Sequence, residues 1–340
     1  MARLDCSQYE EHVNRLLRPP GPEPRGEGGC PAGSFPKQVR RAPRFRICLR
    51  HGQLVDRRIL RFGSWDDCDL LTRLSRRWGR PARVLEVGAY NGICALGFAA
   101  AGAEVVAVEA HPESAALVRA SAALNGFHSL RVVHSAVGAP GWARLVEFGG
   151  NAAGSGLRGG GGGSARTAEP AEALARLGVR AGPREAWLLG RLREARRSFR
   201  SSWQSLPVPV RGLDEVLQGS GGRPFDLVKL DTNGNEAEVL AAAPALLSTR
   251  PPVVQCEIFP GDAEGLAAAA LRLLWGHGYS IFAEEDGMVL LSPASLEAQL
   301  ERLAETRKYI DVVAVDPSWG RRRPDLLALV TRNASELLGW

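Results

Sequence analysis

Five polar residues stand at or just after the ends of short apolar runs, and four of them are carboxylates: Glu86, Glu109, Ser135, Asp231 and Glu257. Such runs, rich in branched residues, are typical of strands buried on both faces of a parallel sheet. Because ligands of open α/β sheets bind outside the carboxyl ends of the strands, these side chains are expected to share one crevice. An acid at a strand end can instead cap a helix. Four together favour a binding or catalytic site.

The segment RVLEVGAYNG, residues 83–92, predicts a nucleotide-binding loop. A strand ends in a turn with two glycines, and an apolar helical stretch over 93–101 follows at once. Glycine lets a ligand approach the backbone closely at a helix N-terminus. The cofactor-binding positions expected in this turn are Gly88, Ala89, Asn91 and Gly92. The next strand ends at Glu109, whose carboxylate can accept both hydroxyls of a ribose.

The acid at position 86 distinguishes between cofactors. A dinucleotide fold places G-x-G-x-x-G after its first strand and keeps the helix N-terminus clear for a diphosphate. Here the turn reads GAYNG, and Glu86 precedes it by two residues. A carboxylate there repels a diphosphate but suits S-adenosylmethionine, which carries an ammonium and a sulfonium. The alternative enzyme, a NAD-dependent oxidoreductase, is disfavoured by Glu86 and by the missing glycine motif.

The elements that must position these groups alternate between strand and helix. Strands are predicted at 44–49, 59–63, 83–87, 104–109, 130–133, 226–231, 252–258, 279–283, 288–291 and 310–315. Helices are predicted at 66–78, 92–101, 112–124, from 236 to 244, 262–275, from 293 and at 324–338. This alternation implies a parallel sheet with right-handed crossovers. The strands at the end of the series suit a seven-stranded mixed sheet with one reversed edge strand.

Composition divides the chain into a flexible N-terminal extension, a catalytic domain and a C-terminal helix. The extension is rich in proline, glycine and arginine, and a Gly-rich stretch at 158–164 marks an insertion within the domain. The insertion contains a basic helical segment at 184–199. It is either a lid over the substrate or a solvent-exposed segment without a role in the site. The predicted ranges are 1–42 for the extension, 80–138 for the cofactor-binding half, 139–210 for the insertion, 211–316 for the acceptor-side half, 43–316 for the whole domain and 317–340 for the C-terminal helix.

The net charge of +6 would permit binding to nucleic acid, yet only three of the 43 basic residues are lysine. That skew is more typical of a GC-rich coding sequence than of a nucleic-acid footprint, so no nucleic-acid partner is expected. The six cysteines show no CxxC pair and no metal-ligand spacing, so reduced thiols and no metal site are expected. No secretory signal or membrane span is predicted, and the expected location is the cytoplasm, with an organelle as the alternative.

Several segments in order resemble the FkbM-type family of S-adenosylmethionine-dependent methyltransferases: LEVGAYNG, VVHSAVG, LDEVL, FDLVKLDTNGNEAEVL and PPVVQCEI. The resemblance runs from about residue 84 to 279, outside the insertion. It implies a Rossmann-like class I methyltransferase fold, with helices on both faces of the sheet, and O-methylation of a hydroxyl on a small molecule or sugar. It adds Ser135 and Ala136 to the expected cofactor site. Within the insertion, Asn151 and Ser155 match the family's small polar loop over the active site.

The sequence departs from the family pattern after the fourth strand. The usual Asp-x-Glu-Gly-x-Glu reads here Asp231-Thr-Asn233-Gly-Asn-Glu236, so Asp231 and Glu236 fit and Asn233 does not. The alternative to an active enzyme is therefore a catalytically reduced, cofactor-binding relative. A nucleic-acid methyltransferase is a further alternative, but the Asn/Asp-Pro-Pro-aromatic loop of that class is absent here.

Methyl transfer to a hydroxyl needs in-line positioning and removal of the hydroxyl proton. Asp231 and Glu257 are the candidates, one as base and the other as the group that orients the acceptor. His134 is the reserve, although a histidine at this position is more often part of the core or rim. Lys229 lies in a strand predicted to be buried and needs a partner, for which Glu86 on the adjacent strand is the candidate.

Overall fold

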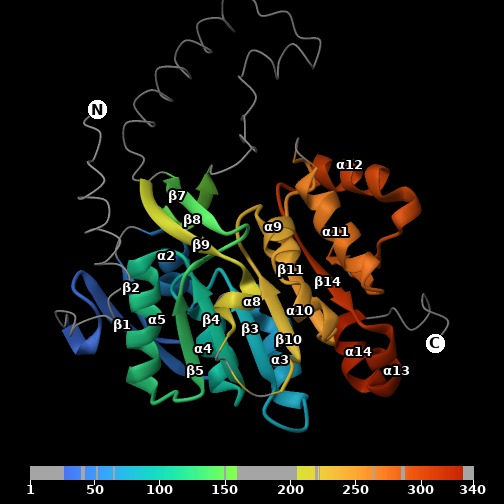
Figure 1. The fold of residues 1–340 in the computed structure, drawn as a ribbon. Helices are drawn as coiled ribbons and strands as arrows, with labels where there is room; N and C mark the ends of the chain where they lie inside the picture. The colour runs from blue at the N-terminus through green and yellow to red at the C-terminus, as the bar shows by residue number, and fades with distance from the viewer. Residues whose placement is uncertain are drawn as a thin grey trace, which may run out of the picture.

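The computed structural model describes residues 27–39, 43–50, 53–63, 66–148, 151–158, 205–218, 221, 223–262, 265–284 and 288–331 (Figure 1). Within these ranges the chain forms one large sheet covered by helices, a smaller sheet above it, and a hairpin near the N-terminal end. The predictions for other segments, including the basic helix at 184–199, fall outside the described residues.

Eight strands form the main sheet, in the spatial order β13-β12-β14-β11-β10-β3-β4-β5. They are β3 (Arg83–Val87), β4 (Glu104–Glu109), β5 (Leu130–His134), β10 (Leu227–Leu230), β11 (Val253–Ile258), β12 (Ser280–Glu284), β13 (Met288–Leu290) and β14 (Ile310–Val315). From β11 to β5 all neighbours pair in parallel, whereas β14 is antiparallel to β11 and β12, and β13 to β12. The predicted Rossmann-like mixed sheet is confirmed.

Two strands run against the others: β14 lies inside the sheet, which the sequence did not predict, and β13 lies at its edge, where one reversed strand was predicted. β14 pairs with β11 on one side and β12 on the other, and five of its six residues are buried. Its sequence, IDVVAV, is typical of a strand covered on both faces. The short strand β13 takes the edge position and raises the count from seven to eight.

Two hydrophobic cores lie on opposite faces of this sheet because successive side chains of a strand alternate. Val84 belongs to one core and Leu85 to the other. The first core is covered by α3 (Asp69–Arg77), α4 (Ile93–Ala100), α5 (Pro112–Asn125), α13 (Pro317–Arg322) and α14 (Pro324–Thr331). The second is covered by α8 (Leu213–Val216), α9 (Glu236–Ala241), α10 (Pro244–Ser248), α11 (Leu266–Gly276) and α12 (Leu296–Thr306), which η3 (Pro293–Ser295) precedes.

The described part of the insertion forms a second sheet, at the top of Figure 1. Its four strands follow the order β6-β9-β7-β8, with β6 (Ala136–Val137), β7 (Gly141–Phe148), β8 (Asn151–Arg158) and β9 (Ser205–Arg211). β7 is antiparallel to β8 and β9, so the insertion leaves the main sheet as a hairpin and returns beside β6. A role as a substrate lid stays a prediction.

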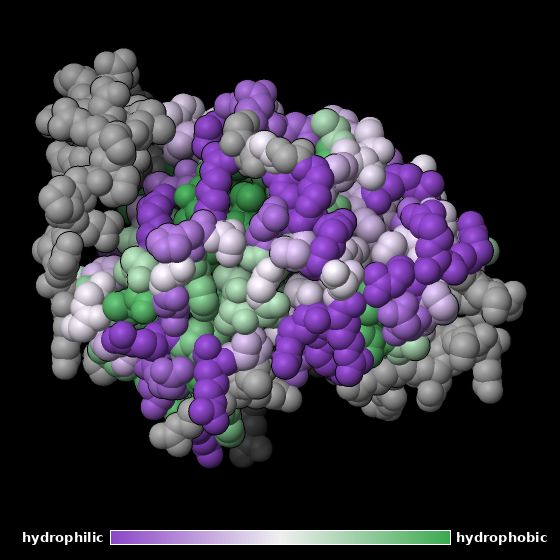
Figure 2. All heavy atoms as spheres, turned by 90° about the horizontal axis from the view of Figure 1, so that it is seen from below, coloured by the Kyte–Doolittle hydropathy of each residue, from purple (hydrophilic) through white to green (hydrophobic). Residues whose placement is uncertain are grey.

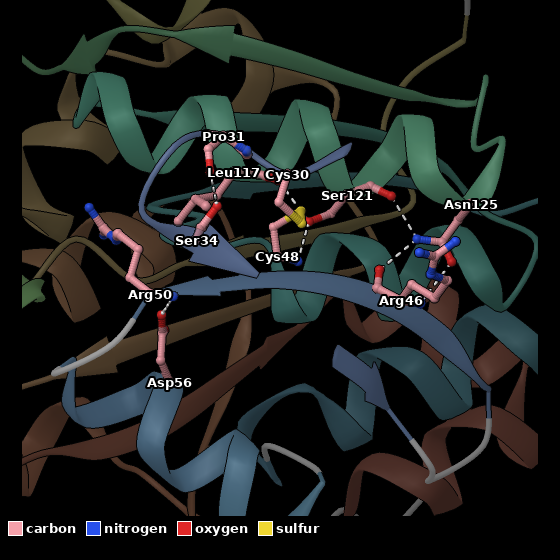
Figure 3. Close-up of a disulfide and its surroundings, with 10 residues drawn as sticks. All are labelled: Cys30, Pro31, Ser34, Arg46, Cys48, Arg50, Asp56, Leu117, Ser121 and Asn125. Atoms are coloured by element: carbon pink, nitrogen blue, oxygen red, sulfur yellow. Dashed lines mark hydrogen bonds between the residues drawn. A yellow bond between two sulfur atoms is a disulfide. The ribbon is translucent and has the colours of Figure 1, made fainter. Parts of the chain in front are cut away.

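The predicted N-terminal extension contains folded structure. η1 (Glu27–Gly29) and β1 (Ser34–Val39) precede β2 (Phe45–Arg50), and β1 pairs with β2 along its whole length. A disulfide between Cys30 and Cys48 closes this hairpin (Figure 3). The backbone N–H of Cys48 donates to the Ser121 hydroxyl of α5 at 2.9 Å, and Asn125 of α5 exchanges two hydrogen bonds with the backbone of Arg46. The hairpin is thus attached to the domain, and the prediction of a flexible segment is wrong for residues 27–39.

A second disulfide joins Cys68 to Cys94, so the expectation of reduced thiols is wrong for four cysteines. Cys68 ends η2 (Asp66–Cys68), and Cys94 lies in the first turn of α4. Among the described residues the free cysteine is Cys256, which is buried. Pairing could not be read from the sequence, because the partners are far apart in the chain and share no spacing motif.

Two further predictions of local structure are corrected. Residues 59–63, predicted as a strand, belong to α2 (Leu54–Phe62), which ends at Gly63 in the left-handed conformation (φ 72°). The buried Ile59 anchors this helix, and the short apolar run did not distinguish helix from strand. At the C-terminal end two short helices, α13 and α14, replace the single helix, and Trp319 of α13 stacks on Trp78 at 5.3 Å between ring centroids.

Figure 2 shows the molecule from below, the side away from the smaller sheet. Polar residues cover much of this face, and apolar residues lie between them. Within the described ranges, no helix is both long and apolar enough to cross a membrane.

Removal of either disulfide should lower the free energy of unfolding by about 3 kcal/mol, because each closes a loop of the unfolded chain. The paired cysteines are 18 and 26 residues apart. Urea unfolding of Cys30→Ala/Cys48→Ala and Cys68→Ala/Cys94→Ala, with and without reductant, measures this loss. The variant lacking all four cysteines is the control and should not respond to reductant. A wild-type protein whose stability is indifferent to reductant would contradict the pairing.

Candidate functional site

A cavity opens at the carboxyl ends of β3, β4, β10 and β11, with Leu145 of β7 on its wall. It lies where the strand order changes direction, because β4 follows on one side of β3 and β10 lies on the other. Such a switch point is where open α/β sheets bind ligands. The sequence-predicted residues that line it are Glu86, Gly88, Ala89, Glu109, Ser135, Ala136, Asp231, Asn233 and Glu257.

The glycine turn brings β3 and β10 together at the floor of the cavity. Gly88 has a φ of 90°, and a Cβ atom there would lie 1.8 Å from the carbonyl oxygen of Asp231. The N–H of Gly88 donates to the Val108 carbonyl at 2.9 Å, and the N–H of Asp231 donates to the Val87 carbonyl at 2.9 Å. No side chain fits at position 88, because both the backbone angle and the neighbouring strand forbid it.

Glu109 holds together the turn that follows β3 and the turn that follows β4. Its two carboxylate oxygens accept hydrogen bonds from the backbone N–H groups of Tyr90, at 2.6 Å, and His111, at 2.7 Å. Burial raises the pKa of Glu109 to about 7, although these two donors oppose the shift. A carboxylate oxygen has more than one lone pair, so Glu109 can accept further donors from the cavity.

Glu86 has a buried carboxyl oxygen that is not hydrogen-bonded. It is 2% exposed, it lines the cavity, and its Oε2 atom has no hydrogen-bond partner in the described structure. Burial raises the pKa of Glu86 to about 8, and the charge of Lys229 only partly opposes this. A buried carboxyl oxygen without a partner fits a ligand that brings a positive charge or a strong donor. It does not fit a diphosphate.

Lys229 pairs with Asp231 and not with Glu86 as its hydrogen-bonded partner. Its ammonium lies 2.8 Å from Asp231 Oδ2, while Glu86 stands opposite Lys229 in the pairing of β3 with β10. Burial alone would lower the pKa of Lys229, but the charges of Asp231, Asp311 and Glu86 outweigh burial and raise it. The predicted pairing of Lys229 with Glu86 is therefore electrostatic only, because the Lys229 ammonium donates its hydrogen bond to Asp231 on its own strand.

The acceptor side of the cavity contains a carboxylic acid that stays protonated at neutral pH. Burial first, and then the charge of Asp231, raise the pKa of Glu257 to about 9. Asp311 stands opposite Glu257 in the β11–β14 pair, and burial raises its pKa to about 6. The Asp231 side chain is 29% exposed and forms an ion pair with Lys229. The two candidate carboxyl groups thus differ in their environment.

Position 233 has a backbone reason to be asparagine. Asn233 adopts a left-handed conformation with a φ of 55°, and Gly234 follows with a φ of 96°. Asparagine tolerates this region better than most residues. Glu236 does not line the cavity; its Oε1 atom accepts hydrogen bonds from the N–H and hydroxyl of Thr232, at 2.7 and 2.9 Å, and burial raises its pKa to about 7. It closes the loop whose Asn233 and Asn235 face the cavity.

Other predicted residues are not brought to the cavity wall. His134 contacts the Ala110 carbonyl at 3.1 Å, and burial lowers its pKa. Asn91 accepts a hydrogen bond from the Ile93 N–H at the start of α4, and Gly92 precedes that helix. None of the three is among the lining residues. Asn151 and Ser155 lie in β8, and their side chains lie outside the described part.

Sequence reasoning missed Asp56, which connects α2 to the glycine turn. Its carboxylate is fully buried and accepts hydrogen bonds from the Arg50 N–H, the Tyr90 hydroxyl and the Asn91 amide, at 2.6, 3.0 and 2.7 Å. Tyr90 lines the cavity with a φ of 49°, and the Arg50 guanidinium lies 5.8 Å from its ring centre. The prediction of a strand at 59–63 concealed the helix that carries Asp56.

The main sheet is open and mostly parallel, with a glycine turn at its switch point. An acid precedes that turn, and another acid ends the next strand. Together these features define a Rossmann-like methyltransferase fold. The sequence model described as "Methyltransferase FkbM domain" matches residues 86–281, and the chain belongs to that family. The resemblance inferred from the sequence motifs is confirmed.

Three solved methyltransferase structures show a weak similarity. The O-methyltransferase from Bacillus cereus in complex with SAH has 12% identity and a TM-score of 0.37, over 74% of this chain and 80% of that one. The O-methyltransferase TomG from Streptomyces achromogenes, in complex with SAM, has 15% identity and a TM-score of 0.37 over the same shares. A precorrin-6y C5,15-methyltransferase from Geobacter metallireducens GS-15 has 11% identity and a TM-score of 0.34, over 72% of this chain and 86% of that one. At these values the similarities carry no argument about the substrate. A search of curated proteins returns no match.

The ligand-free protein should lose stability as the pH rises from 6 to 9. Glu109 and Glu236 have pKa values of about 7, Glu86 of about 8 and Glu257 of about 9. Because these values lie above those of the unfolded chain, the folded state holds protons that the unfolded state releases, so the stabilisation present at low pH is lost through this window. Urea unfolding across the window measures the slope.

Glu86→Gln removes one of these groups and should flatten the slope, by at most about 1.4 kcal/mol per pH unit. Glu301→Gln, at an exposed position of α12, is the matched control and should leave the slope as it is. A wild-type stability that rises between pH 6 and 9 would contradict the burial of ionisable carboxyl groups at this edge.

Proposed function

We propose that this chain is an S-adenosylmethionine-dependent methyltransferase that methylates a hydroxyl group of a small molecule or sugar. The observation that carries the proposal is the buried carboxyl group of Glu86, which lines the cavity beside the glycine turn and whose Oε2 atom has no hydrogen-bond partner in the described structure. It is supported by membership of the FkbM methyltransferase family. A catalytically reduced relative is disfavoured, because the left-handed backbone at position 233 accounts for the asparagine there.

The cofactor's cationic groups would bind beside Glu86, and its ribose hydroxyls would donate to Glu109. The backbone of Gly88 and Ala89 and the wall formed by Ser135 and Ala136 complete this half of the cavity. When bound, S-adenosylmethionine supplies an electrophilic methyl group. NAD would bring a diphosphate to an edge that carries carboxylates, and we propose that the cavity rejects it.

Asp231 is the proposed base. Asp231 would take the hydroxyl proton of the acceptor as the acceptor oxygen is methylated. Lys229, 2.8 Å from Oδ2, holds the carboxylate in place between turnovers. Glu257, with a pKa of about 9, holds its proton at neutral pH and so orients the acceptor as a hydrogen-bond donor. His134 does not line the cavity and takes no step.

The two disulfides bear on where the enzyme works. Disulfides persist in oxidising compartments and are rare in the cytoplasm. Both pairs tie elements around the cavity, since Cys94 itself lines it and Cys48 belongs to the hairpin packed on α5. We therefore propose an oxidising compartment in place of the cytoplasm expected from the sequence.

Calorimetry with S-adenosylmethionine and, separately, with NAD tests the cofactor. S-adenosylmethionine should bind and NAD should not, and Glu86→Gln should weaken the binding at least about tenfold, since it removes the anionic partner of the ligand's positive charge. Heat from NAD alone would overturn the proposal.

The base assignment predicts different outcomes for two isosteric changes. Asp231→Asn should lower kcat by about 10²- to 10⁴-fold and leave the Kd for S-adenosylmethionine nearly unchanged, because the amide cannot take the proton. Glu257→Gln should lower kcat by less than about tenfold, because the amide still donates a hydrogen bond. Transfer of label from S-adenosylmethionine to acceptors in a cell extract measures the loss of activity in each variant. The reverse order of the two losses would move the base to Glu257.

A further inference from the structure

Asp56 is a buried acid outside the cavity that binds the glycine turn on the cavity's wall. It belongs to α2, is fully buried and is not among the described residues that line the cavity. Its Oδ1 atom accepts hydrogen bonds from the Tyr90 hydroxyl at 3.0 Å and the Asn91 amide at 2.7 Å. Its Oδ2 atom accepts one from the Arg50 N–H at 2.6 Å. Two of these three donors come from the turn that follows β3.

Tyr90 has a backbone conformation that tyrosine disfavours. Its φ of 49° lies in the left-handed region, where the Cβ atom of an L-residue crowds the backbone. A residue keeps such a conformation when the surrounding contacts determine it. The Tyr90 side chain is held by the hydrogen bond from its hydroxyl to Asp56, and the Arg50 guanidinium lies 5.8 Å from its ring centre. Asp56 therefore stabilises the observed shape of the turn.

The same conformation of Tyr90 gives Glu109 one of its two backbone donors. The N–H of Tyr90 donates to Glu109 Oε2 at 2.6 Å, and the N–H of His111 donates to Oε1 at 2.7 Å. Each carboxylate oxygen is thus held by one backbone group, and its remaining lone pairs keep a fixed direction. If Tyr90 left the left-handed region, its N–H would turn away from Glu109. The position of Glu109 therefore depends on Asp56 through Tyr90.

Arg50 fixes Asp56 in turn. Arg50 ends β2, and Figure 3 shows the hydrogen bond that joins its backbone to Asp56 of α2. The Arg50 guanidinium donates to Glu113 at 3.0 Å and to Ser114 at 3.2 Å, both in the first turn of α5. Asp56 is therefore held between the hairpin and α5 before any ligand binds, which is what a group that orients others requires.

The first half of the glycine turn does not depend on Asp56. The N–H groups of Gly88 and Ala89 both donate to the Val108 carbonyl, at 2.9 and 3.2 Å. These bonds tie that half of the turn directly to β4. Loss of Asp56 should therefore disturb Tyr90 and Asn91 and leave the backbone at 88 and 89 in place.

We propose that Asp56 is a positioning residue for the cofactor: through Tyr90 it holds Glu109 where the carboxylate receives the ribose hydroxyls of S-adenosylmethionine. This inference rests on the proposed methyl transfer and gives a role to a residue outside the cavity. Loss of Asp56 weakens the recognition of the ribose and spares the contacts beside Glu86. A residue that only supported the fold would, on its loss, weaken every ligand of the cavity alike.

The decisive experiment is calorimetry of the full chain with two ligands, S-adenosylhomocysteine and its analogue without the ribose 2′-hydroxyl. The wild type should bind the analogue at least about tenfold more weakly, because Glu109 loses a charge-assisted hydrogen bond. In Asp56→Ala this ratio of the two Kd values should fall at least about threefold, because a displaced Glu109 no longer meets the hydroxyl.

Tyr90→Phe tests the same contact with a smaller change, since it removes only the hydroxyl that donates to Asp56 and keeps the ring. It should lower the ratio of the two Kd values in the same direction. In the Asp56→Ala background it should have no further effect, because the partner of the hydroxyl is already absent. If Asp56→Ala does not fold, Tyr90→Phe alone decides.

Two matched variants control for a general loss of structure. Asp214→Ala removes an acid that accepts hydrogen bonds from two backbone N–H groups of α10, at 2.7 and 3.1 Å. Tyr279→Phe removes a hydroxyl that donates to the Pro251 carbonyl at 2.9 Å. Neither Asp214 nor Tyr279 is among the described residues that line the cavity. Both variants should keep the wild-type ratio of the two Kd values.

A ratio that is the same in Tyr90→Phe as in the wild type would overturn the positioning role of Asp56 and leave methyl transfer standing. Equal binding of the two ligands by the wild type would do the same, because Glu109 would then not receive the hydroxyl. A wild type that does not bind S-adenosylhomocysteine would overturn the proposed methyl transfer as well.

Discussion

A single buried ammonium group must balance carboxyl groups contributed by several strands at one edge of the sheet. Lys229 lies in the middle of β10, with Glu86 opposite it on β3 and the acids of β11 and β14 on the other side. Its hydrogen bond goes to Asp231, at the end of its own strand. Desolvation makes every remaining charge costly, so the other acids hold protons or await a partner. The chemistry of the cavity follows from this imbalance.

The carboxyl groups of the cofactor side and of the acceptor side of the cavity differ in their hydrogen-bond partners and their pKa values. On the cofactor side, the Oε2 atom of Glu86 lacks a hydrogen-bond partner, and Glu109 already accepts hydrogen bonds from two backbone N–H groups. On the acceptor side, Asp231, which forms an ion pair with Lys229, contrasts with Glu257, whose pKa is about 9. Two carboxyl groups in different environments can act as base and as donor at the same pH. Fixed positions for both halves come from the close approach of Gly88 to the Asp231 carbonyl.

The walls of the cavity depend on segments that are far apart in the chain. Asp56 of α2 fixes Tyr90 and Asn91 of the glycine turn, and the disulfide from Cys68 reaches Cys94 in the first turn of α4. The hairpin β1–β2 supports these contacts from outside, clamped by its own disulfide onto α5 (Figure 3). Loss of these ties would loosen the turn that receives the cofactor.

The sequence by itself determined the strands of the main sheet and the helices that alternate with its parallel strands, the glycine turn, and the presence of acids at the strand ends. These features are local, because burial on both faces produces continuous apolar runs and a turn with positive φ requires glycine. Strand order, the partner of Lys229, the disulfide pairs and the role of Asp56 were decided only in the tertiary structure. Each depends on residues distant in the chain, as with β14, whose apolar run could have paired at an edge or between two neighbours. Which side chains line the cavity depended likewise on packing, since Glu86 and Asn91 belong to one motif and only Glu86 faces the ligand space.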